Sequence, residues 1–478
     1  MDAEFAARQE RNPLLDAAGW QMFRFLHQHP RAPRWNYQVG DRLRAEDLPA
    51  LHSYRERVRQ ERPCWQASPP DWLLAWIERL EPQVPLWRER LPVGFNLRRD
   101  WVHIPTTCRE DIASRLERLV PQDADLARLI VYETNGTSTG HALDVPNHPA
   151  AVALNHPLLE FALAHQAVRP RLDARHVACI NVGAEARTVT FANVFAAWGN
   201  AGFAKVNLHE ASWTRDQARR FFTEVQPEFL TGDPVAFATY ADWAIDYRPK
   251  AMISTATRLS AELKQELQAR YGCPVIDFYS TTETGPIAYA GLSDDGFSLL
   301  PPDLYLESLD ADGFPVAPGE LGEITVSGGH NPYLPLLRYR TGDHARLEPA
   351  GNADDPAPRL LDLHARAPVL FRALSGAPVH PLDIAYVLRT QVWVQHELLQ
   401  RVDGSLRLTI RPGLATRIDR QALEDGFDTL FGKQPLEIIE DPQLGSDRPG
   451  GKVVAYRSEI SPGSGAGSRG AWTQGGCT

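Results

Sequence analysis

The chain has 478 residues, of which 43% are hydrophobic and 23% charged, and its formal net charge is −10. This length is too great for one compact core and predicts two or more domains. The acidic balance argues against a nucleic-acid groove, and the start of the chain shows no signal peptide or long apolar run, so we expect a cytoplasmic protein with no membrane partner.

Residues 1–100 are rich in Arg, Pro and Trp and predict a helical N-terminal cap that forms part of a large domain. Trp72 and Trp76 share one face of the helix expected at 72–80. Seven of the twelve tryptophans lie in the first 101 residues, which fits either an aromatic ligand surface or a packed core. We expect core packing, because aromatic side chains are bulky core fillers.

The rest of the chain predicts an α/β protein with a β-rich lobe and a small C-terminal domain. Strand-like runs at 177–182, 251–254 and 275–279 alternate with helical stretches such as 259–271, which favours parallel βαβ units. Strands and turns dominate 304–348, and 364–460 reads as a small α+β domain. We expect the core to span 101–363 and the Gly- and Ser-rich tail 461–478 to be disordered.

A loop with two glycines and four hydroxyl residues follows the apolar run 129–132. Glycine lets backbone N–H groups turn toward a phosphate, and hydroxyls add further donors. No Gly-Lys-Ser/Thr follows, so this is no Walker loop, and an ordinary surface turn is the alternative. The loop consists of Thr134, Asn135, Gly136, Thr137, Ser138, Thr139 and Gly140.

Two further segments carry residues suited to a nucleotide. In 275–286 an apolar strand runs into Tyr279, which can stack on a purine, and Glu283, which can hold Mg²⁺ beside substrate phosphates. In 337–343 a Thr-Gly turn precedes Asp343, whose carboxylate can accept both hydroxyl protons of a ribose. The alternatives are a solvated glutamate at a strand end and an Arg/Asp pair at a hairpin end.

Lys452 follows a Pro-Gly-Gly turn near the C-terminus. The chain has only five lysines, at 205, 250, 264, 433 and 452, whereas its other basic residues are arginines. A lysine on a flexible hinge can deliver a point charge to a reacting centre, and an exposed loop lysine is the alternative.

The four segments, in this order, resemble the adenylate-forming superfamily of acyl-CoA synthetases, firefly luciferases and nonribosomal peptide adenylation domains. Within it the resemblance is closest to the phenylacetate-CoA ligase branch, and it runs from about residue 90 to 460. The segments 227–234 and 251–257 also look like parts of that branch. The resemblance implies ATP and Mg²⁺ as cofactors and a small C-terminal domain that moves between half-reactions.

Roles follow from the resemblance residue by residue. The loop 134–140 would hold the ATP phosphates, Glu283 would bind Mg²⁺, and Lys452 would bridge the carboxylate and the α-phosphate during adenylation. The expected catalytic residues are Lys452, Glu283 and Thr282. Tyr279 and the backbone at Ala256 and Thr257 would flank adenine, and Asp343 would bind the ribose. The nucleotide site would further include Asp277, Phe278, Ser280, Thr281 and Arg366.

The acid substrate would bind near 191–202 in this branch. Phe195, Trp198, Gly199 and Gly202 there suggest a pocket for a flat ring, and an aryl or arylacetic acid is the leading expectation. Alternatively, Phe195 and Trp198 simply pack a helix one turn apart.

Two departures bear on the reaction. His141 stands where a lysine often follows the phosphate loop, and Ala367-Pro368 stands where acidic hinge residues are usual, so a hinge there would be stiffer. We therefore expect acyl-AMP formation followed by transfer to CoA, with an amide synthetase or a carrier-protein ligase as an alternative. A degenerate nucleotide-binding homologue is a third possibility, and a monomer or homodimer is expected.

The five cysteines, at 64, 108, 179, 273 and 477, are dispersed and include no Cys-x-x-Cys pair. Some relatives in the branch carry a structural zinc, but this spacing predicts none. We expect free thiols.

Overall fold

The structure, a computed structural model, divides into two compact units. It describes residues 3–91, 94–133, 143–185, 188–290, 296–351, 356–365, 369, 371–379, 381–388, 390–413, 417–446 and 453–460. One unit comprises residues 1–41, 168–277 and 368–467, and the other comprises 42–167, 278–367 and 468–478. These units divide the N-terminal hundred residues after Asp41. The domain boundaries expected from the sequence stay a prediction.

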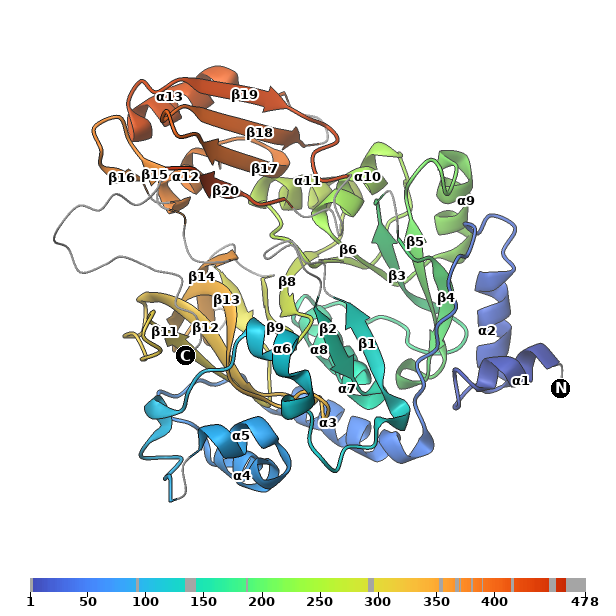
Figure 1. Cartoon of the computed structure of the whole chain (residues 1–478). Coiled ribbons are helices and arrows are strands. Elements are labelled where there is room, and N and C mark those ends of the chain that lie inside the picture. The colour runs from blue at the N-terminus through green and yellow to red at the C-terminus, as the bar shows by residue number, and fades with distance from the viewer. Residues whose placement is uncertain are drawn as a thin grey trace. The chain divides into compact units, whose positions relative to one another are not determined.

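The first unit contains the predicted parallel sheet (Figure 1). Its strands follow the order β8-β7-β6-β3-β5-β4, and all neighbours are parallel except β4 and β5. The central strands are buried along most of their length, as expected for strands covered on both faces. The strands are β3 (Val177–Gly183), β4 (Phe191–Phe195), β5 (Ala201–Asn207), β6 (Phe229–Gly232), β7 (Ala251–Ser254) and β8 (Val275–Thr281), of which residues 275–277 belong to this unit.

Helices cover this sheet and share one hydrophobic core with it. Helix α2 packs beside β4 and β5, and Phe221 and Phe222 of α9 are fully buried (Figure 1). Ser260 caps α11 by accepting a hydrogen bond from the Leu263 N–H at 3.2 Å, which explains why the predicted helix starts there. The helices are α1 (Ala3–Gln9), α2 (Ala17–His27), α9 (Arg215–Val225), α10 (Pro234–Asp242) and α11 (Ala261–Tyr271).

The C-terminal part of this unit has its own core of buried residues between 371 and 438. Its sheet has the order β19-β18-β17-β20, in line with the predicted small α+β domain. The elements are β15 (Phe371–Arg372), β16 (Pro378–Val379), α12 (Pro381–Leu388), β17 (Trp393–Gln400), β18 (Leu406–Pro412), α13 (Arg420–Phe431), β19 (Leu436–Glu440) and β20 (Tyr456–Ser458).

His396 on β17 is buried between aromatic rings, with Trp393 at 4.5 Å and Tyr456 at 5.2 Å between centroids. Neither ring nitrogen has a hydrogen-bond partner among the described residues. Burial, aided by the charge of Arg258, lowers the pKa of His396 to about 4. The folded protein therefore holds this imidazole neutral well below the pH at which the unfolded chain protonates it.

We expect this histidine to make the fold acid-sensitive. Below about pH 6.5 this histidine binds a proton in the unfolded chain but not in the folded protein. The free energy of unfolding therefore falls between about pH 6.5 and pH 4, and at pH 5 the loss is about 2 kcal/mol. In His396→Phe this acid-dependent loss of stability is absent, and the buried ring nitrogens without hydrogen-bond partners are removed. Urea unfolding at pH 7 and pH 5 measures the difference, with His52→Phe at an exposed position as the control. An equal loss in His396→Phe and the wild type would contradict the assignment.

The second unit contains the predicted β-rich lobe. Its strands follow the order β11-β12-β13-β14-β10-β9, and the pairs of β10 to β14 are antiparallel, while β1 and β2 form a separate ribbon. The strands are β1 (Ile130–Glu133), β2 (Asp144–Asn147), β9 (Gly285–Ala290), β10 (Phe297–Leu299), β11 (Leu304–Leu309), β12 (Leu321–Gly328), β13 (Leu336–Glu348) and β14 (Arg359–Ala365).

Helices between residues 48 and 165 complete this unit. Trp87 and Trp101 fill its core, as expected, but the same expectation is wrong for Trp72, whose side chain is 40% exposed. The helices are α3 (Leu48–Gln60), α4 (Asp71–Leu80), α5 (Pro85–Arg90), α6 (Arg109–Leu119), α7 (Pro149–Ala153) and α8 (Asn155–His165).

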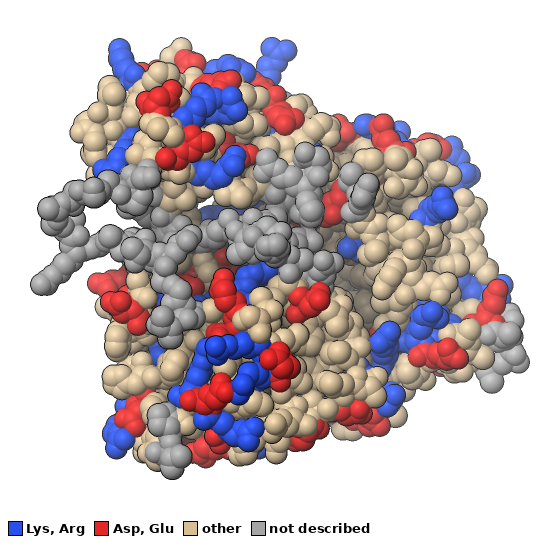
Figure 2. Space-filling model, viewed as in Figure 1, with Lys and Arg blue, Asp and Glu red and all other residues tan. Residues whose placement is uncertain are grey.

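The surface and the cysteines fit a globular protein with mixed charge. Figure 2 shows basic and acidic side chains interspersed over the visible face. Among the helices of the described residues, none has the length and apolar character needed to cross a lipid bilayer. Cys64, Cys179 and Cys273 are free thiols, as expected, but the expectation is wrong for Cys108, which is disulfide-bonded. Burial raises the pKa of Cys179 and Cys273 to about 12.

Candidate active site at the end of strand β8

A cavity of about 280 Å³ lies where β8 ends and the predicted acidic turn begins. Thr281 shapes this turn: its hydroxyl accepts a hydrogen bond from the Thr284 N–H at 3.1 Å. Gly285 closes it at φ +74°, so close to helix α8 that a Cβ would lie 2.8 Å from Asn155 Oδ1. The cavity is lined by residues 280–286 with Tyr132, Asn147, Ala151, Val152, Asn155, His330 and Asn331.

Glu283 lies in this turn with its carboxylate buried. The Tyr339 hydroxyl donates to Glu283 Oε1 at 3.0 Å, and Arg109 Nη1 approaches the same oxygen at 3.4 Å. Burial and the charge of Glu283 raise the pKa of Tyr339 well above its ordinary value, so the hydroxyl stays a donor. Two side chains from β13 and α6 thus hold the predicted Mg²⁺ ligand in place.

Tyr279 and Asp343 come together although 64 residues separate them. The Tyr279 hydroxyl donates to Asp343 Oδ2 at 2.9 Å, and the ring is buried to 8% exposure. Burial, then the charge of Asp343, raises the pKa of Tyr279 well above its ordinary value. The predicted adenine-side and ribose-side residues therefore form one cluster, with Tyr279 as hydrogen-bond donor and Asp343 as acceptor.

The turn before Asp343 is fixed by polar contacts to β12. Gly342 has φ +81° and donates its N–H to Glu323 Oε1 at 3.0 Å, while Arg340 Nε donates to Glu323 Oε2 at 2.7 Å. The Thr341 hydroxyl donates to the Ile324 carbonyl at 2.7 Å. Arg340 thus pairs with Glu323, and the Tyr279 hydroxyl contacts Asp343.

The predicted adenine-side residues of the first unit form a strained loop after β7. Ala256 has φ +71°, a conformation that side chains other than glycine rarely adopt. Asp277 Oδ2 accepts the Leu259 N–H at 3.1 Å and so fixes the end of this loop. The Thr257 hydroxyl is buried with no hydrogen-bond partner among the described residues.

The residues expected around the acid lie at the end of β4 and in β5. Phe195 and Trp198 do not occupy one helix: Phe195 ends β4, and Trp198 belongs to the 3₁₀ turn Ala196–Trp198. Trp198 is buried against Phe229, and a Cβ on Gly202 would lie 2.7 Å from the Met22 sulfur. Gly199, at φ +59°, ends the 3₁₀ turn. Their role toward the acid stays a prediction.

The other predicted site residues differ in their exposure to solvent. Phe278 is buried, Ser280 and Thr281 are half-buried and Thr282 is exposed. Sequence reasoning missed Arg109 and His330; only the Gly-Gly turn before His330 marked that segment. The loop 134–140, His141, Arg366, the hinge positions 367–368 and Lys452 lie outside the described residues.

Comparison with solved structures establishes the fold. A structure of 2-hydroxyisobutyryl-CoA ligase in the postadenylation state, in complex with 2-HIB-AMP, matches with a TM-score of 0.60 and 14% identity, covering 86% of this chain and 90% of that chain. The same ligase with R3-HIB-AMP matches with a TM-score of 0.59 and 15% identity, covering 89% and 97%. The chain has the adenylate-forming CoA ligase fold.

This adenylate-forming fold accounts for both predicted parts, the large α/β region and the smaller C-terminal region. No protein-family model matches the chain, and no curated protein matches it. Within the described ranges, no group of three or more His, Cys, Asp or Glu side chains is arranged to hold a metal ion.

Proposed function

We propose that the chain activates a carboxylic acid with ATP, forming an acyl-AMP and releasing pyrophosphate, and then transfers the acyl group to the thiol of CoA. The observation that carries the proposal is the Tyr279–Asp343 cluster beside buried Glu283, within a fold shared with a ligase that binds an acyl-AMP. An aryl or arylacetic acid and a place in the phenylacetate-CoA ligase branch are parts of this proposal.

The residues present fit a bound Mg²⁺. Both contacts of Glu283 with described side chains reach Oε1, and the turn adds the hydroxyls of Ser280, Thr281 and Thr282 at the same cavity. Mg²⁺ takes oxygen ligands and is usually held by one or two carboxylates plus phosphates. When bound, the ion would neutralise charge on the ATP phosphates, while Tyr339 and Arg109 orient Glu283.

The other residues act by binding and charge. Asp343, fixed by Tyr279, would accept the ribose hydroxyls. The loop 134–140 would hold phosphates through its N–H and hydroxyl donors, and Lys452 would approach the carboxylate and the α-phosphate as they react. Two anions must meet in this step, so positive charge and alignment supply the catalysis.

Carboxylate-dependent ATP–pyrophosphate exchange tests the proposal. The panel comprises aryl, arylacetic, fatty and amino acids, without CoA or amines, so that only the first half-reaction is read. Exchange with one class would establish adenylation and name the substrate class. No exchange with any acid, alongside intact ATP binding, would favour the degenerate homologue.

The acceptor is tested next on the acid that supports exchange. Product formation with CoA supports the thiol ligase, whereas product only with an amine or a carrier protein supports the alternative that the Ala367-Pro368 hinge raised. Mass spectrometry of the product distinguishes these outcomes.

We expect Asp343→Asn to raise the KM for ATP in the exchange assay about tenfold, with kcat nearly unchanged. The amide can still accept from the Tyr279 hydroxyl, but it loses the charge-assisted hydrogen bond to the ribose, worth about 1.5–3 kcal/mol. Asp312→Asn, at an exposed position of the same unit, is the isosteric control. An unchanged KM in Asp343→Asn would remove the ribose from the proposal.

A further inference from the structure

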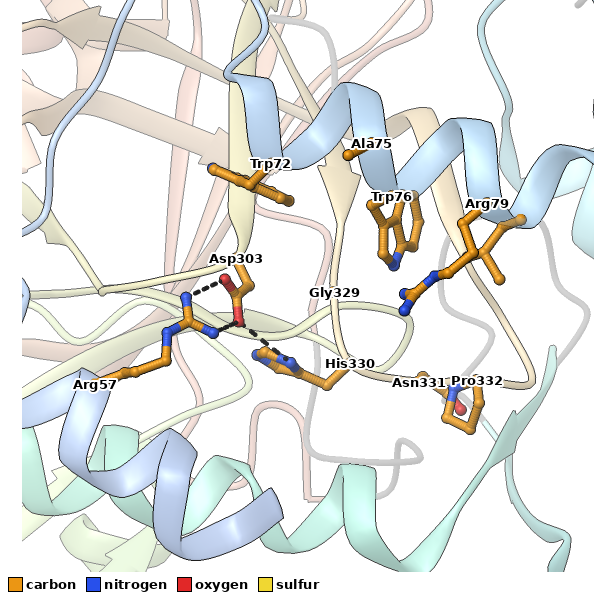
Figure 3. Close-up of a pocket in the computed structure, with 11 residues that line it drawn as sticks. Arg57, Trp72, Ala75, Trp76, Arg79, Asp303, Gly329, His330, Asn331 and Pro332 are labelled. Atoms are coloured by element: carbon orange, nitrogen blue, oxygen red, sulfur yellow. Dashed lines mark hydrogen bonds and ion pairs between the residues drawn. The ribbon is translucent and has the colours of Figure 1, made fainter. Parts of the chain in front are cut away.

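A second cavity, of about 610 Å³, lies between helix α4 and the turn at 329–332 (Figure 3). It lies within the second unit and has a size typical of small-molecule sites, about 300–1,000 Å³. None of the nucleotide-site motifs contributes to it. It is lined by Arg57, Trp72, Ala75, Trp76, Arg79, Leu80, Asp303, Gly329, His330, Asn331 and Pro332.

Two tryptophans form the wall contributed by α4. Trp72 and Trp76 are one helical turn apart, and Figure 3 shows both rings extending from the helix toward the turn. Trp76 rests against Trp87, with 5.4 Å between ring centroids, whereas Trp72 keeps 40% of its surface exposed. Such a wall offers flat apolar area that a planar ring would cover favourably.

The charges on the opposite side largely cancel. Arg57 donates to both oxygens of Asp303, at 2.9 and 2.6 Å, and its Nε also donates to Glu61 at 2.9 Å, outside the cavity lining. His330 lies 3.7 Å from Asp303 Oδ2, and burial lowers the pKa of His330, so its ring is neutral near pH 7. Among the residues that line the cavity, the charges of Arg57 and Asp303 therefore offset each other.

Among the residues that line the cavity, Arg79 carries the one charge that no other lining residue offsets. Its guanidinium points toward the cavity beside Trp76 (Figure 3), and no ion pair joins it to any residue that the structure describes. Guanidinium binds carboxylates through a planar fork of donors, and it also lies favourably against aromatic faces. A cavity with two indoles and one unpaired cation thus favours a flat ligand that carries one negative charge.

We propose that this cavity binds a planar aromatic carboxylate, with its ring against Trp72 and Trp76 and its carboxylate on Arg79. The site is distinct from the Glu283 cavity, but His330 and Asn331 line both. A ligand here would lie across one turn from the proposed reaction centre. The inference does not rest on the proposed adenylation, since it follows from the shape and charge of this cavity alone.

Fluorine NMR of the full chain labelled with 5-fluorotryptophan tests this with 2-naphthoate as the probe. Trp72→Phe and Trp76→Phe assign the two resonances among the twelve tryptophans. We expect naphthoate to shift both resonances in a saturable manner. In Arg79→Gln the dissociation constant should rise about tenfold, as expected for loss of one charge-assisted contact.

Two controls make the outcome decisive. Arg62→Gln removes an exposed charge outside the cavity and should leave binding within about twofold. The neutral analogue 2-naphthylmethanol should bind about tenfold more weakly than naphthoate. The inference is overturned if naphthoate leaves both resonances unmoved, if Arg79→Gln binds as the wild type does, or if the alcohol binds as well as the acid.

Discussion

Arg338→Met is expected to lower the free energy of unfolding by about 3–5 kcal/mol, because it breaks a buried ion pair from one side. The Arg338 side chain is 1% exposed, and its Nε lies 3.2 Å from Glu307 Oε2. Its other nitrogens donate to the carbonyls of Val102 at 3.0 Å, Ile104 at 2.7 Å and Gly313 at 2.9 Å. Methionine fills the space but leaves all four acceptors without this donor.

The carboxyl left behind determines much of the cost. Even beside Arg338, burial raises the pKa of Glu307, so without the arginine this group must take up a proton or remain charged in the interior. The double variant Arg338→Met with Glu307→Gln should therefore recover part of the loss. Glutamine keeps an acceptor for the Trp101 indole N–H, which donates to Glu307 Oε1 at 3.0 Å.

Urea unfolding at pH 7 measures the free energy of unfolding of both variants. Strand β13 also offers a control position. Arg346, also on β13, pairs with Asp362 at 3.1 Å near the surface, where an ion pair contributes about 0–1 kcal/mol. Arg346→Met should thus cost far less than Arg338→Met. Equal losses at the two positions would show that the buried network does not anchor β13.

This network also matters for the candidate site. Arg338 directly precedes Tyr339, which holds Glu283, and its carbonyl accepts the Thr107 N–H at 2.9 Å, while the Arg340 N–H donates to the Thr107 carbonyl at 2.8 Å. Residues 338–340 are thus held from both the side chain and the backbone. The position of Glu283 depends on contacts far outside its own turn.

The strands of the fold were readable from the sequence where they are continuous apolar runs. The run 251–254 coincides with β7, whose four residues are all buried and show no polar alternation that would blur the ends of the strand. Helix α4 was predicted within one residue of its start. Periodicity showed that Trp72 and Trp76 share one face of the helix, but not whether another element covers that face. The exposed ring of Trp72 shows that the face is not fully covered.

The candidate site was readable as residue types but not as contacts. The turn with Glu283 and the strand with Asp343 were both expected at a nucleotide. The contact of Tyr279 with Asp343, however, joins β8 to β13, which are not neighbours in the sheet. Arg109 lies 174 residues from Glu283 on a helix without any motif. Such partners follow from tertiary packing, which a single sequence does not encode locally.

Lys452→Ala is expected to reduce carboxylate-dependent ATP–pyrophosphate exchange by at least about 100-fold while leaving ATP binding nearly intact. Removal of one donor that stabilises charge in a transition state typically costs a factor of about 10²–10³. Lys452→Arg should restore little, because a planar guanidinium does not replace a compact ammonium on a flexible stem. Exchange at saturating acid measures the rate, and equilibrium binding of ATP measures the nucleotide site separately.

The other lysines show why this one is the candidate. Lys250 forms an ion pair with buried Glu228, Lys264 is itself buried, and burial lowers the pKa of Lys205. Lys433 is exposed in the same C-terminal region, so Lys433→Ala removes the same charge and should leave exchange unchanged. If Lys452→Ala exchanges within tenfold of the wild type, the lysine has no role in adenylation; if ATP binding is lost with it, its role is to hold the nucleotide rather than to promote the reaction.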